Sequence, residues 1–356
     1  MKIKNLVLAL GIGLIGYGVY TTSIKVLTIQ PEPGLLAGKT LATIVNYDSV
    51  NYGCLVNTPP DSLAAKLRAL QQMGLQFTRG TVVLQNWAGK NANIDYFIKN
   101  GITPAINLNW NIQGTKTPYP IGPELEQYST LVKAVTEKYP CKLFVIENEE
   151  LNKSYHSGTY FQYIDMLLTA GPIIHSSGGT FTNGGVTLKM SRILTYRDLK
   201  TTYPDSAEKF LINCIPAADT SWIKTKGTRK QEQQILDQIN LLNWYSRSNL
   251  DYVNLHIYLP IIERGNNTVN TGLGVYGLNS IIGYISRITG KPVISNEFGL
   301  MDQNYDLVQN SLNTINSEGL KYCILYSGHK AEEPFVNNKG LTVNGLSVSD
   351  YMKNKK

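Results

Sequence analysis

The sequence predicts an α/β fold of the (β/α)8 TIM-barrel class, and three observations support this prediction. From residue 40 onward, short apolar segments alternate with amphipathic segments, which is the order of a parallel sheet covered by helices. The alternation supplies eight strand–helix units in residues 40–356, the number that closes such a barrel. No GxGxxG or GxxxxGKS/T loop follows the first strand, although a nucleotide-binding open sheet would need one.

The predicted strands are short runs rich in Val, Ile, Leu and aromatic residues. They cover residues 41–46, 75–83, 102–110, 142–149, 180–186, 251–258, 291–299 and 321–328.

The predicted helices have apolar residues three and four positions apart. They cover residues 58–74, 91–101, 122–140, 159–176, 231–245, 278–290, 305–318 and 347–353. In the first helix Thr58 is the expected N-cap, Pro59 suits the first helical position, and Gly74 ends the helix. Residues 188–248 are longer than one crossover needs, so we expect an insertion there.

The 356-residue chain has a globular composition, with 42% hydrophobic and 17% charged residues. Its net charge is +7, but the sequence has no long basic run with interleaved aromatic residues. We therefore do not predict nucleic-acid binding. The four cysteines form no CxxC pair, and the four histidines form no HxxxH or HxH pair. We therefore expect no metal site, no cofactor and four buried thiols, with one disulfide as the alternative in an exported protein.

The N-terminus has the pattern of a secretory signal. A short basic segment, MKIKN, precedes the charge-free apolar run LVLALGIGLIGYGVY. We interpret residues 1–23 as a signal peptide or signal anchor, residues 24–39 as a linker and residues 40–356 as the barrel domain. The expected location is outside the cytoplasm, either secreted or attached to a membrane through this segment; a buried core segment is the alternative.

Polar residues cluster at the C-terminal ends of the predicted strands, where the active sites of such barrels lie. They are Arg79 on the second strand, Asn107, Asn109 and Trp110 on the third, Glu147 to Glu150 on the fourth, His256 and Tyr258 on the sixth, Asn296 and Glu297 on the seventh, and Tyr326 and Ser327 on the eighth.

Two of these strands end in glutamates that are distant in sequence but would face each other across one barrel mouth. Glycoside hydrolysis needs such a pair: one carboxyl group protonates the leaving oxygen, and the other attacks the sugar or activates water. Aromatic side chains such as Trp110 and Tyr326 stack on sugar rings, and asparagine side chains such as Asn109 bind hydroxyl groups. The predicted partner is therefore a carbohydrate.

Four motifs resemble clan A of the glycoside hydrolases, the 4/7 superfamily of cellulases, mannanases and β-xylosidases. IENEELN resembles the fourth-strand pattern of this family, with Asn148 and Glu149 as its Asn–Glu pair. KPVISNEFG resembles the seventh-strand pattern, with Glu297 as the second acid. LHIY resembles the sixth-strand His-x-Tyr, and FTRG puts Arg79 at the position of the second-strand arginine. The resemblance covers nearly all of the chain after residue 40.

The resemblance implies that Glu149 is the general acid/base, that Glu297 is the nucleophile, and that Asn148 binds the sugar 2-hydroxyl. Arg79 and Tyr258 would keep Glu297 ionised and oriented. It also implies retention of configuration, with the two carboxyl groups about 5–5.5 Å apart.

His256 would contact the substrate or support this network, and Asn296 belongs to the same supporting set. A purely structural role is the alternative for several of these residues. Arg79 would then be a core salt-bridge partner, His256 a buried core histidine, and Trp110 and Tyr326 packing residues.

The sequence departs from the family pattern at three positions. Glu150 stands where the family usually has proline, Glu147 where it often has tryptophan, and Tyr326 in the region of a common eighth-strand tryptophan. These changes alter the sugar-binding floor and leave the two acids in place.

Strand alternation places Glu147 and Glu149 on the same side of the fourth strand. We therefore expect Glu147, one step deeper, to raise the pKa of Glu149 by like-charge repulsion or to pair with an arginine such as Arg79. Glu150 begins the next loop and is expected to be solvated.

The leading hypothesis is an exported retaining glycoside hydrolase that cleaves O-glycosidic bonds by double displacement. A non-catalytic barrel that binds glycans is the alternative from another class. A transglycosylase would use the same two acids. The sequence predicts no particular sugar, linkage or oligomeric state.

Overall fold

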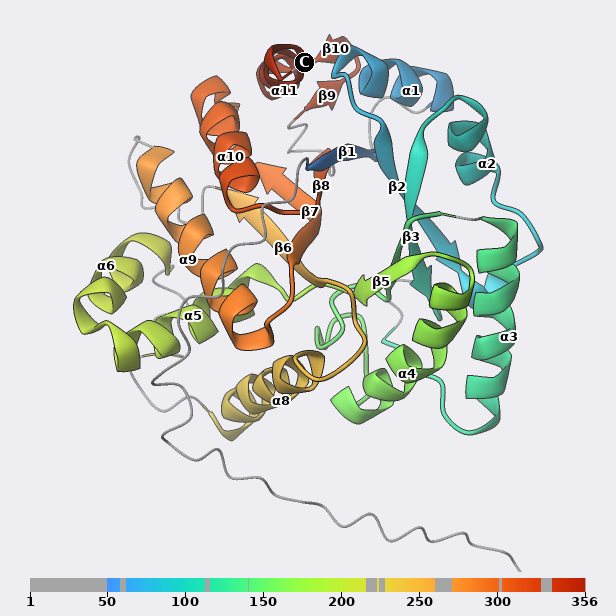
Figure 1. Cartoon of the computed structure of the whole chain (residues 1–356), viewed down its shortest axis with the longest axis horizontal. Coiled ribbons are helices and arrows are strands. Elements are labelled where there is room, and N and C mark those ends of the chain that lie inside the picture. Colours follow the sequence, from blue (N-terminus) through green and yellow to red (C-terminus); the bar gives the residue numbers. More distant parts are fainter. Residues whose placement is uncertain are drawn as a thin grey trace, which may run out of the picture. The chain divides into compact units, whose positions relative to one another are not determined.

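Eight parallel strands form a nearly closed barrel, and the helices lie in an outer ring around it (Figure 1). The computed structural model describes residues 50–57, 62–112, 116–139, 141–215, 223, 228–259, 271–300, 303–327 and 335–355, with backbone only for 271–276. All of them belong to one compact unit, Leu41–Lys356. The TIM-barrel class predicted from the sequence is confirmed.

The strands follow the order β5-β4-β3-β2-β1-β8-β7-β6, and every neighbouring pair is parallel. Their bounds are β1 Asn51–Val56, β2 Phe77–Val83, β3 Thr103–Asn109, β4 Leu143–Ile146, β5 Thr180–Asn183, β6 Val253–Leu259, β7 Val293–Leu300 and β8 Tyr322–Ser327. Bridges Thr182–Tyr252 and Val186–Leu255, each with one residue beyond the strand bounds, join the chain at β5 to the chain at β6. Two bridges therefore close the ring between β5 and β6.

The helices follow the strands in the order predicted for the fold. They are α1 Leu63–Gln72, α2 Ala92–Lys99, α3 Pro123–Lys138, α4 Tyr160–Ser176, α5 Leu188–Thr202, α6 Pro204–Cys214, α8 Arg229–Tyr245, α9 Thr271–Thr289, α10 Tyr305–Ser317 and α11 Val343–Asn354. A short hairpin, β9 Val336–Asn337 with β10 Gly340–Leu341, precedes α11. The expected insertion after β5 corresponds to α5 and α6, which lead to α8.

The barrel interior is apolar in one layer and polar in the next. Ala105 and Leu143 pair in register with each other, and Ala105 pairs with Arg79, so all three point into the barrel. Ala105 and Leu143 belong to a small buried cluster with Val145, Ile294 and Tyr322. This apolar layer closes the barrel below Arg79 and leaves the polar residues at the carboxyl ends of the strands.

Two local predictions at the start of the barrel need correction. The predicted strand 41–46 lies outside the described residues, and the strand that pairs with β2 and β8 is Asn51–Val56. Thr58 and Pro59 also lie outside the described residues, and the N-cap of α1 is Ser62, whose side chain accepts a hydrogen bond from the Ala65 amide. Gly74 ends this helix as expected, with a φ of +72°.

The cysteines are free and buried, so the prediction of four buried thiols is confirmed. The predicted signal segment, residues 1–23, and linker, residues 24–39, lie outside the described residues. Among the helices of the described part of the chain, none combines the length and apolarity needed to cross a bilayer.

Candidate active site

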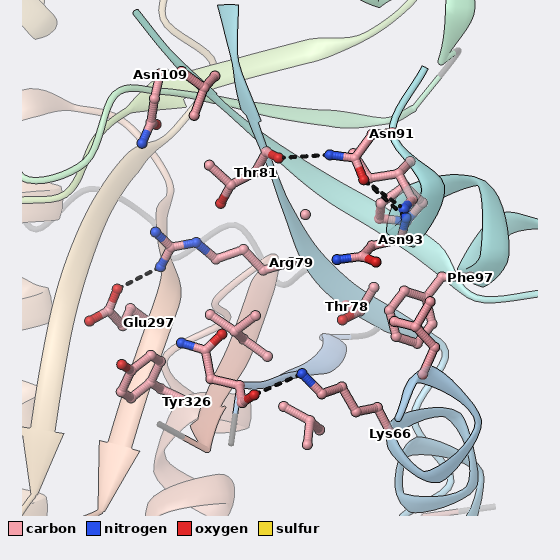
Figure 2. A pocket seen from close by; sticks show the side chains of 18 of the residues that line it. Lys66, Thr78, Arg79, Thr81, Asn91, Asn93, Phe97, Asn109, Glu297 and Tyr326 are labelled. Carbon is pink, nitrogen blue, oxygen red and sulfur yellow. Dashed lines mark hydrogen bonds and ion pairs between the residues drawn. The ribbon is translucent and has the colours of Figure 1, made fainter. Parts of the chain in front are cut away.

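A cleft of about 910 Å³ opens at the carboxyl ends of the strands and contains both predicted acids. Figure 2 shows the side chain of Arg79 pointing from β2 toward Glu297, with Tyr326 beside them and Asn109 across the cleft. On the other side of β2 the lining continues through residues of α1 and α2 and the loop before α2. These are Leu63, Lys66, Asn91, Asn93, Ile94 and Phe97.

Glu297, on β7, is held by two hydrogen-bond donors. Arg79 Nη1 lies 2.5 Å from Glu297 Oε2, and the Tyr258 hydroxyl donates to Glu297 Oε1. The second terminal nitrogen of Arg79 donates to Asn148 Oδ1 at 2.7 Å. The contacts of Arg79 and Tyr258, one to each oxygen, fix the orientation of the Glu297 carboxyl group.

Glu149 is held on both of its oxygens at the same cleft. His256 Nδ1 lies 3.1 Å from Glu149 Oε1, and Asn152 donates to Glu149 Oε2 at 2.6 Å. The same His256 nitrogen lies 3.8 Å from Glu297 Oε2. One buried imidazole therefore stands beside both carboxylates.

The environment moves the pKa of Glu149 and that of His256 in opposite directions. Burial raises the pKa of Glu149, but the hydrogen bond and charge of His256, with Asn152 and Arg79, outweigh it and lower the pKa overall. Burial lowers the pKa of His256, but the carboxylates of Glu297 and Glu149 outweigh it and raise the pKa. Each group therefore stabilises the charged form of the other.

The segment after β4 does not continue the strand, which corrects the expected alternation. The strand ends at Ile146, and Glu147 and Glu149 have φ values of +65° and +48°. This left-handed backbone is uncommon outside glycine and occurs where the surroundings enforce it. Here the Tyr163 hydroxyl donates to Ile146 O at 2.8 Å, and the Tyr119 hydroxyl donates to Glu150 O.

Glu147 does not have either of its expected partners. Its Oε1 accepts from the Trp110 amide at 2.5 Å, while Arg79 binds other groups. Burial raises the pKa of Glu147 to about 8. The pKa of Glu149 is lowered and not raised, and Arg79 pairs with Glu297 and Asn148, so both expectations for Glu147 are wrong.

Glu150 is buried, so the expectation of a solvated side chain is also wrong. Its Oε1 accepts from Asn183 Nδ2 and from the Tyr245 hydroxyl, each at 2.8 Å. Only 1% of the residue is exposed, and burial raises the pKa of its carboxyl group. Glu150 thus has a structural role, because its hydrogen bonds connect the chain after β4 to β5 and α8.

The aromatic candidates separate into one cleft residue and one core residue. Trp110 is buried and packs edge to face on Tyr128, with ring centroids 6.1 Å apart. It lies outside the described cleft lining, so its position supports the packing alternative. Tyr326 lines the cleft and packs edge to face on Tyr258 at 6.1 Å.

Two asparagines of the site are positioned differently from each other. Asn109 lines the cleft, and its Oδ1 has no hydrogen-bond partner among the described residues. Asn296 is fully buried, and its Oδ1 lies 3.0 Å from His256 Nε2. Sequence reasoning missed Asn152, which donates to Glu149. Its Oδ1 accepts a hydrogen bond from the Ser154 amide at 2.9 Å, and asparagine favours turns of this kind, so a local turn pattern is the sequence feature that could have indicated it.

No protein-family model and no curated protein matches the chain. Solved structures with the same barrel do match. A glucosidase from Croceicoccus marinus aligns with a TM-score of 0.54 and 10% identity over 85% of this chain and 66% of its own. The chain has the fold of glycoside hydrolases. A GH5-4 broad-specificity endoglucanase from Clostridium cellulovorans aligns with a TM-score of 0.51 and 13% identity over 83% of this chain and 87% of its own.

A third similar structure is a family 39 glycoside hydrolase from Bacteroides cellulosilyticus, with a TM-score of 0.50, 13% identity, and coverage of 86% of this chain and 64% of that one. This chain therefore spans less than two thirds of the glucosidase and of the family 39 enzyme. At such low identity the similarity establishes the fold, and the resemblance to clan A inferred from the four motifs is confirmed at that level.

Proposed function

We propose that the protein is a retaining glycoside hydrolase in which Glu297 is the nucleophile and Glu149 the general acid/base. One observation carries the proposal: Glu149 and Glu297 line the same cleft and both lie within 3.8 Å of the same nitrogen of His256. Paired carboxylates at the mouth of such a barrel are the groups that glycosidic bond cleavage requires.

The spacing of the two acids supports retention of configuration. His256 Nδ1 is 3.1 Å from Glu149 Oε1 and 3.8 Å from Glu297 Oε2, so these oxygens can be no farther apart than the two distances added together. Retaining enzymes separate their carboxyl groups by about 5–5.5 Å and inverting enzymes by about 6.5–9.5 Å. The limit applies to this pair of oxygens and is compatible with the first range.

In the first step, Glu297 Oε attacks the anomeric carbon while Glu149 gives a proton to the departing glycosidic oxygen. The bond between the anomeric carbon and the leaving oxygen breaks, and a glycosyl ester of Glu297 forms. In the second step, Glu149 takes a proton from water, and the hydroxide adds to the anomeric carbon and releases Glu297. Arg79 and Tyr258 stabilise the carboxylate of Glu297 before the attack and after its release.

The lining of the cleft supports a neutral carbohydrate as substrate. Apart from the acids and Arg79, the described lining is mainly aliphatic, aromatic and uncharged polar, with one lysine, Lys66. Its uncharged polar groups include six amide or hydroxyl residues, Asn57, Thr78, Thr81, Asn91, Asn93 and Asn109, besides the tyrosines. Amide and hydroxyl groups among apolar side chains are suited to hydroxyl-rich ligands.

A panel of aryl glycosides and polysaccharides tests the proposal with the wild-type protein and Glu149→Ala. We expect wild type to cleave at least one substrate, and Glu149→Ala to lose about 10²–10⁴-fold in kcat on substrates with poor leaving groups, because it cannot protonate them. Ser295→Ala, a buried change on β7 away from the cleft, is the control. Equal behaviour of wild type and Glu149→Ala on every substrate would refute the enzyme reading.

A further inference from the structure

Three fully buried asparagines form a row beneath His256, one on each of three neighbouring strands. Asn183 ends β5, Asn254 lies on β6 and Asn296 lies on β7. Fully buried asparagines are uncommon, and each needs partners for two donors and an oxygen. These three satisfy one another and the surrounding backbone, so the direction of each hydrogen bond can be determined.

The first determination starts from a backbone amide, which can only donate. The Asn296 N–H points at the side chain of Asn254 at 2.9 Å, so the atom it meets is the oxygen Oδ1. The other atom of that amide is therefore Nδ2, a donor, and it lies 2.6 Å from the side chain of Asn296. The atom of Asn296 that receives this bond must be Oδ1.

The second determination starts from a backbone carbonyl, which can only accept. Glu147 O lies 3.3 Å from the side chain of Asn107, so the donating atom is Nδ2. The remaining atom, Asn107 Oδ1, accepts at 3.2 Å from the side chain of Asn296, which must present Nδ2 there. Both ends of the network thus assign the same orientation to Asn296, with its oxygen on the side of His256.

This orientation fixes which nitrogen of His256 carries a permanent proton. Asn296 Oδ1 can only accept, and it lies 3.0 Å from His256 Nε2, so Nε2 is protonated and donates. Nδ1 is then the only ring nitrogen that gains or loses a proton, and it lies 3.1 Å from Glu149 Oε1. The other oxygen of Glu149 already accepts from Asn152 Nδ2.

We propose that Asn296 is a positioning residue that fixes the tautomer of His256, so that Nδ1 and Glu149 share a single exchangeable proton. The inference rests on the proposed role of Glu149 and deepens it. A carboxylate facing a bare Nδ1 lone pair is an unfavourable arrangement, and it becomes favourable when either group holds one proton. The acid/base function therefore belongs to the pair.

Among the described residues, the charged and titratable groups around the pair include His156 in the loop after β4, whose pKa burial lowers against the opposing effect of the charge of Glu149. The charge of Glu297 on β7 raises the pKa of His256, and the charge of Arg79 on β2 lowers it. The Tyr258 hydroxyl, on β6, donates a hydrogen bond to Glu297. Glu150, after β4, lies at the far end of the asparagine row, bonded to Asn183. Asn296 is uncharged, so it selects the tautomer without adding to this field.

Nuclear magnetic resonance of protein labelled with ¹⁵N-histidine measures the tautomer directly. The chain has four histidines, and a His256→Gln sample assigns the signal of interest. We expect Nε2 of His256 to remain protonated at every pH at which the protein is folded, while only Nδ1 titrates. A neutral His256 protonated at Nδ1 would overturn the proposal.

Asn296→Ala and Asn296→Asp separate the effect on the tautomer from a packing effect. Without the acceptor, Asn296→Ala should populate both tautomers, lower kcat most for poor leaving groups and shift the pH dependence of kcat. Asn296→Asp keeps an acceptor, so Nε2 should stay protonated, while the added charge extends the basic limb to higher pH. Ser295→Ala, which removes a neighbouring buried hydrogen bond to Leu255 O, should change neither the tautomer nor the pH profile.

The outcomes also separate this inference from the proposed function. If no glycoside is cleaved but His256 has the predicted tautomer and Asn296→Ala disturbs it, the hydrogen-bond assignment stands and the glycosidase proposal fails. If glycosides are cleaved and Asn296→Ala leaves the tautomer and the pH profile as in wild type, the inference is wrong and the glycosidase proposal stands.

Discussion

Glu147, Glu149 and Glu150 show how three acids within four positions acquire different states from their surroundings. Glu149 lies at the cleft beside His256, which lowers its pKa, whereas burial raises the pKa of the other two. The sequence indicated which residue types gather here. It did not indicate their directions, because the period of two applies to extended backbone and two of these residues have positive φ values.

The structure brings together residues from the four motifs that resemble glycoside hydrolases, which lie at separate strands. Arg79, Asn148, Tyr258 and Glu297 form one connected set of hydrogen bonds. The partners that the sequence did not reveal are asparagines such as Asn254. Their roles depend on which amide group faces which neighbour, and no local pattern specifies this.

Glu147→Gln tests the buried, uncharged state of Glu147. The pKa of Glu147 is about 8 in the folded protein, above its ordinary value of 4.5. The folded state therefore holds a proton that the unfolded chain releases, and this lowers stability progressively as pH rises from about 4.5 to about 8. Glutamine keeps an oxygen for the Trp110 amide and cannot ionise.

Between pH 4.5 and pH 9, we expect the stability of wild type to fall relative to that of Glu147→Gln. The difference between their free energies of unfolding should change by about 4 kcal/mol. Urea unfolding at several pH values measures this difference. Glu137→Gln, on an exposed side chain of α3, is the control and should follow wild type. A parallel pH dependence of wild type and Glu147→Gln would show that Glu147 is ionised in the folded state.

At the scale of elements, the helices and most strands were predictable because their apolar period is local. The first strand, Asn51–Val56, was not predicted, since NYGCLV contains Asn, Gly and Cys and lies next to a more apolar segment. The early end of β4 was missed for a different reason. The prediction continued the strand from the apolar run Leu143–Ile146 through Glu149, but Glu147 and Glu149 have positive φ values, which no extended strand has.

Gly185→Ala tests how the connection between β5 and α5 positions His256. Gly185 has a φ of +127°, and a Cβ atom there would lie 2.3 Å from His256 Nε2. The imidazole would have to move, and a displacement of about 1 Å can cost about 10²-fold in rate. We expect a loss of this size in kcat/KM, with a shifted ¹⁵N signal of His256.

Gly178→Ala separates backbone strain from the collision. Gly178 also has a positive φ, +78°, but a Cβ atom there meets nothing within 4 Å. Its substitution should cost about 1–2 kcal/mol of stability and leave kcat/KM unchanged. Equal losses of activity in the two variants would mean that strain, and not contact with His256, explains the effect of Gly185→Ala.

At the scale of the whole molecule, the order of elements was sufficient to predict the barrel. An apolar strand followed by an amphipathic helix, repeated eight times, leaves few other ways to bury both faces of a parallel sheet. The similarity to solved glycoside hydrolases at 10–13% identity has the same origin. The fold depends on the pattern of burial, which many different sequences satisfy.

The N-terminal segment leads to a prediction about the chain as a whole. We propose that residues 1–23 direct export, and the described barrel belongs to the compact unit Leu41–Lys356. C-terminally tagged full-length protein should appear outside the cytosol of a bacterial host on cell fractionation. A chain starting at Leu41 should stay in the cytosol and keep the wild-type specific activity; full-length protein found only in the cytosol would contradict the proposed signal.

The central claim is that Glu297 is the nucleophile of a double displacement, and azide rescue of Glu297→Ala tests it most directly. The variant should lose turnover on an activated aryl glycoside that wild type cleaves, and added azide should restore cleavage and give a glycosyl azide of inverted anomeric configuration. The matched variant Glu147→Ala should show no rescue. Failure of azide to rescue Glu297→Ala, with rescue of Glu147→Ala instead, would contradict the assignment.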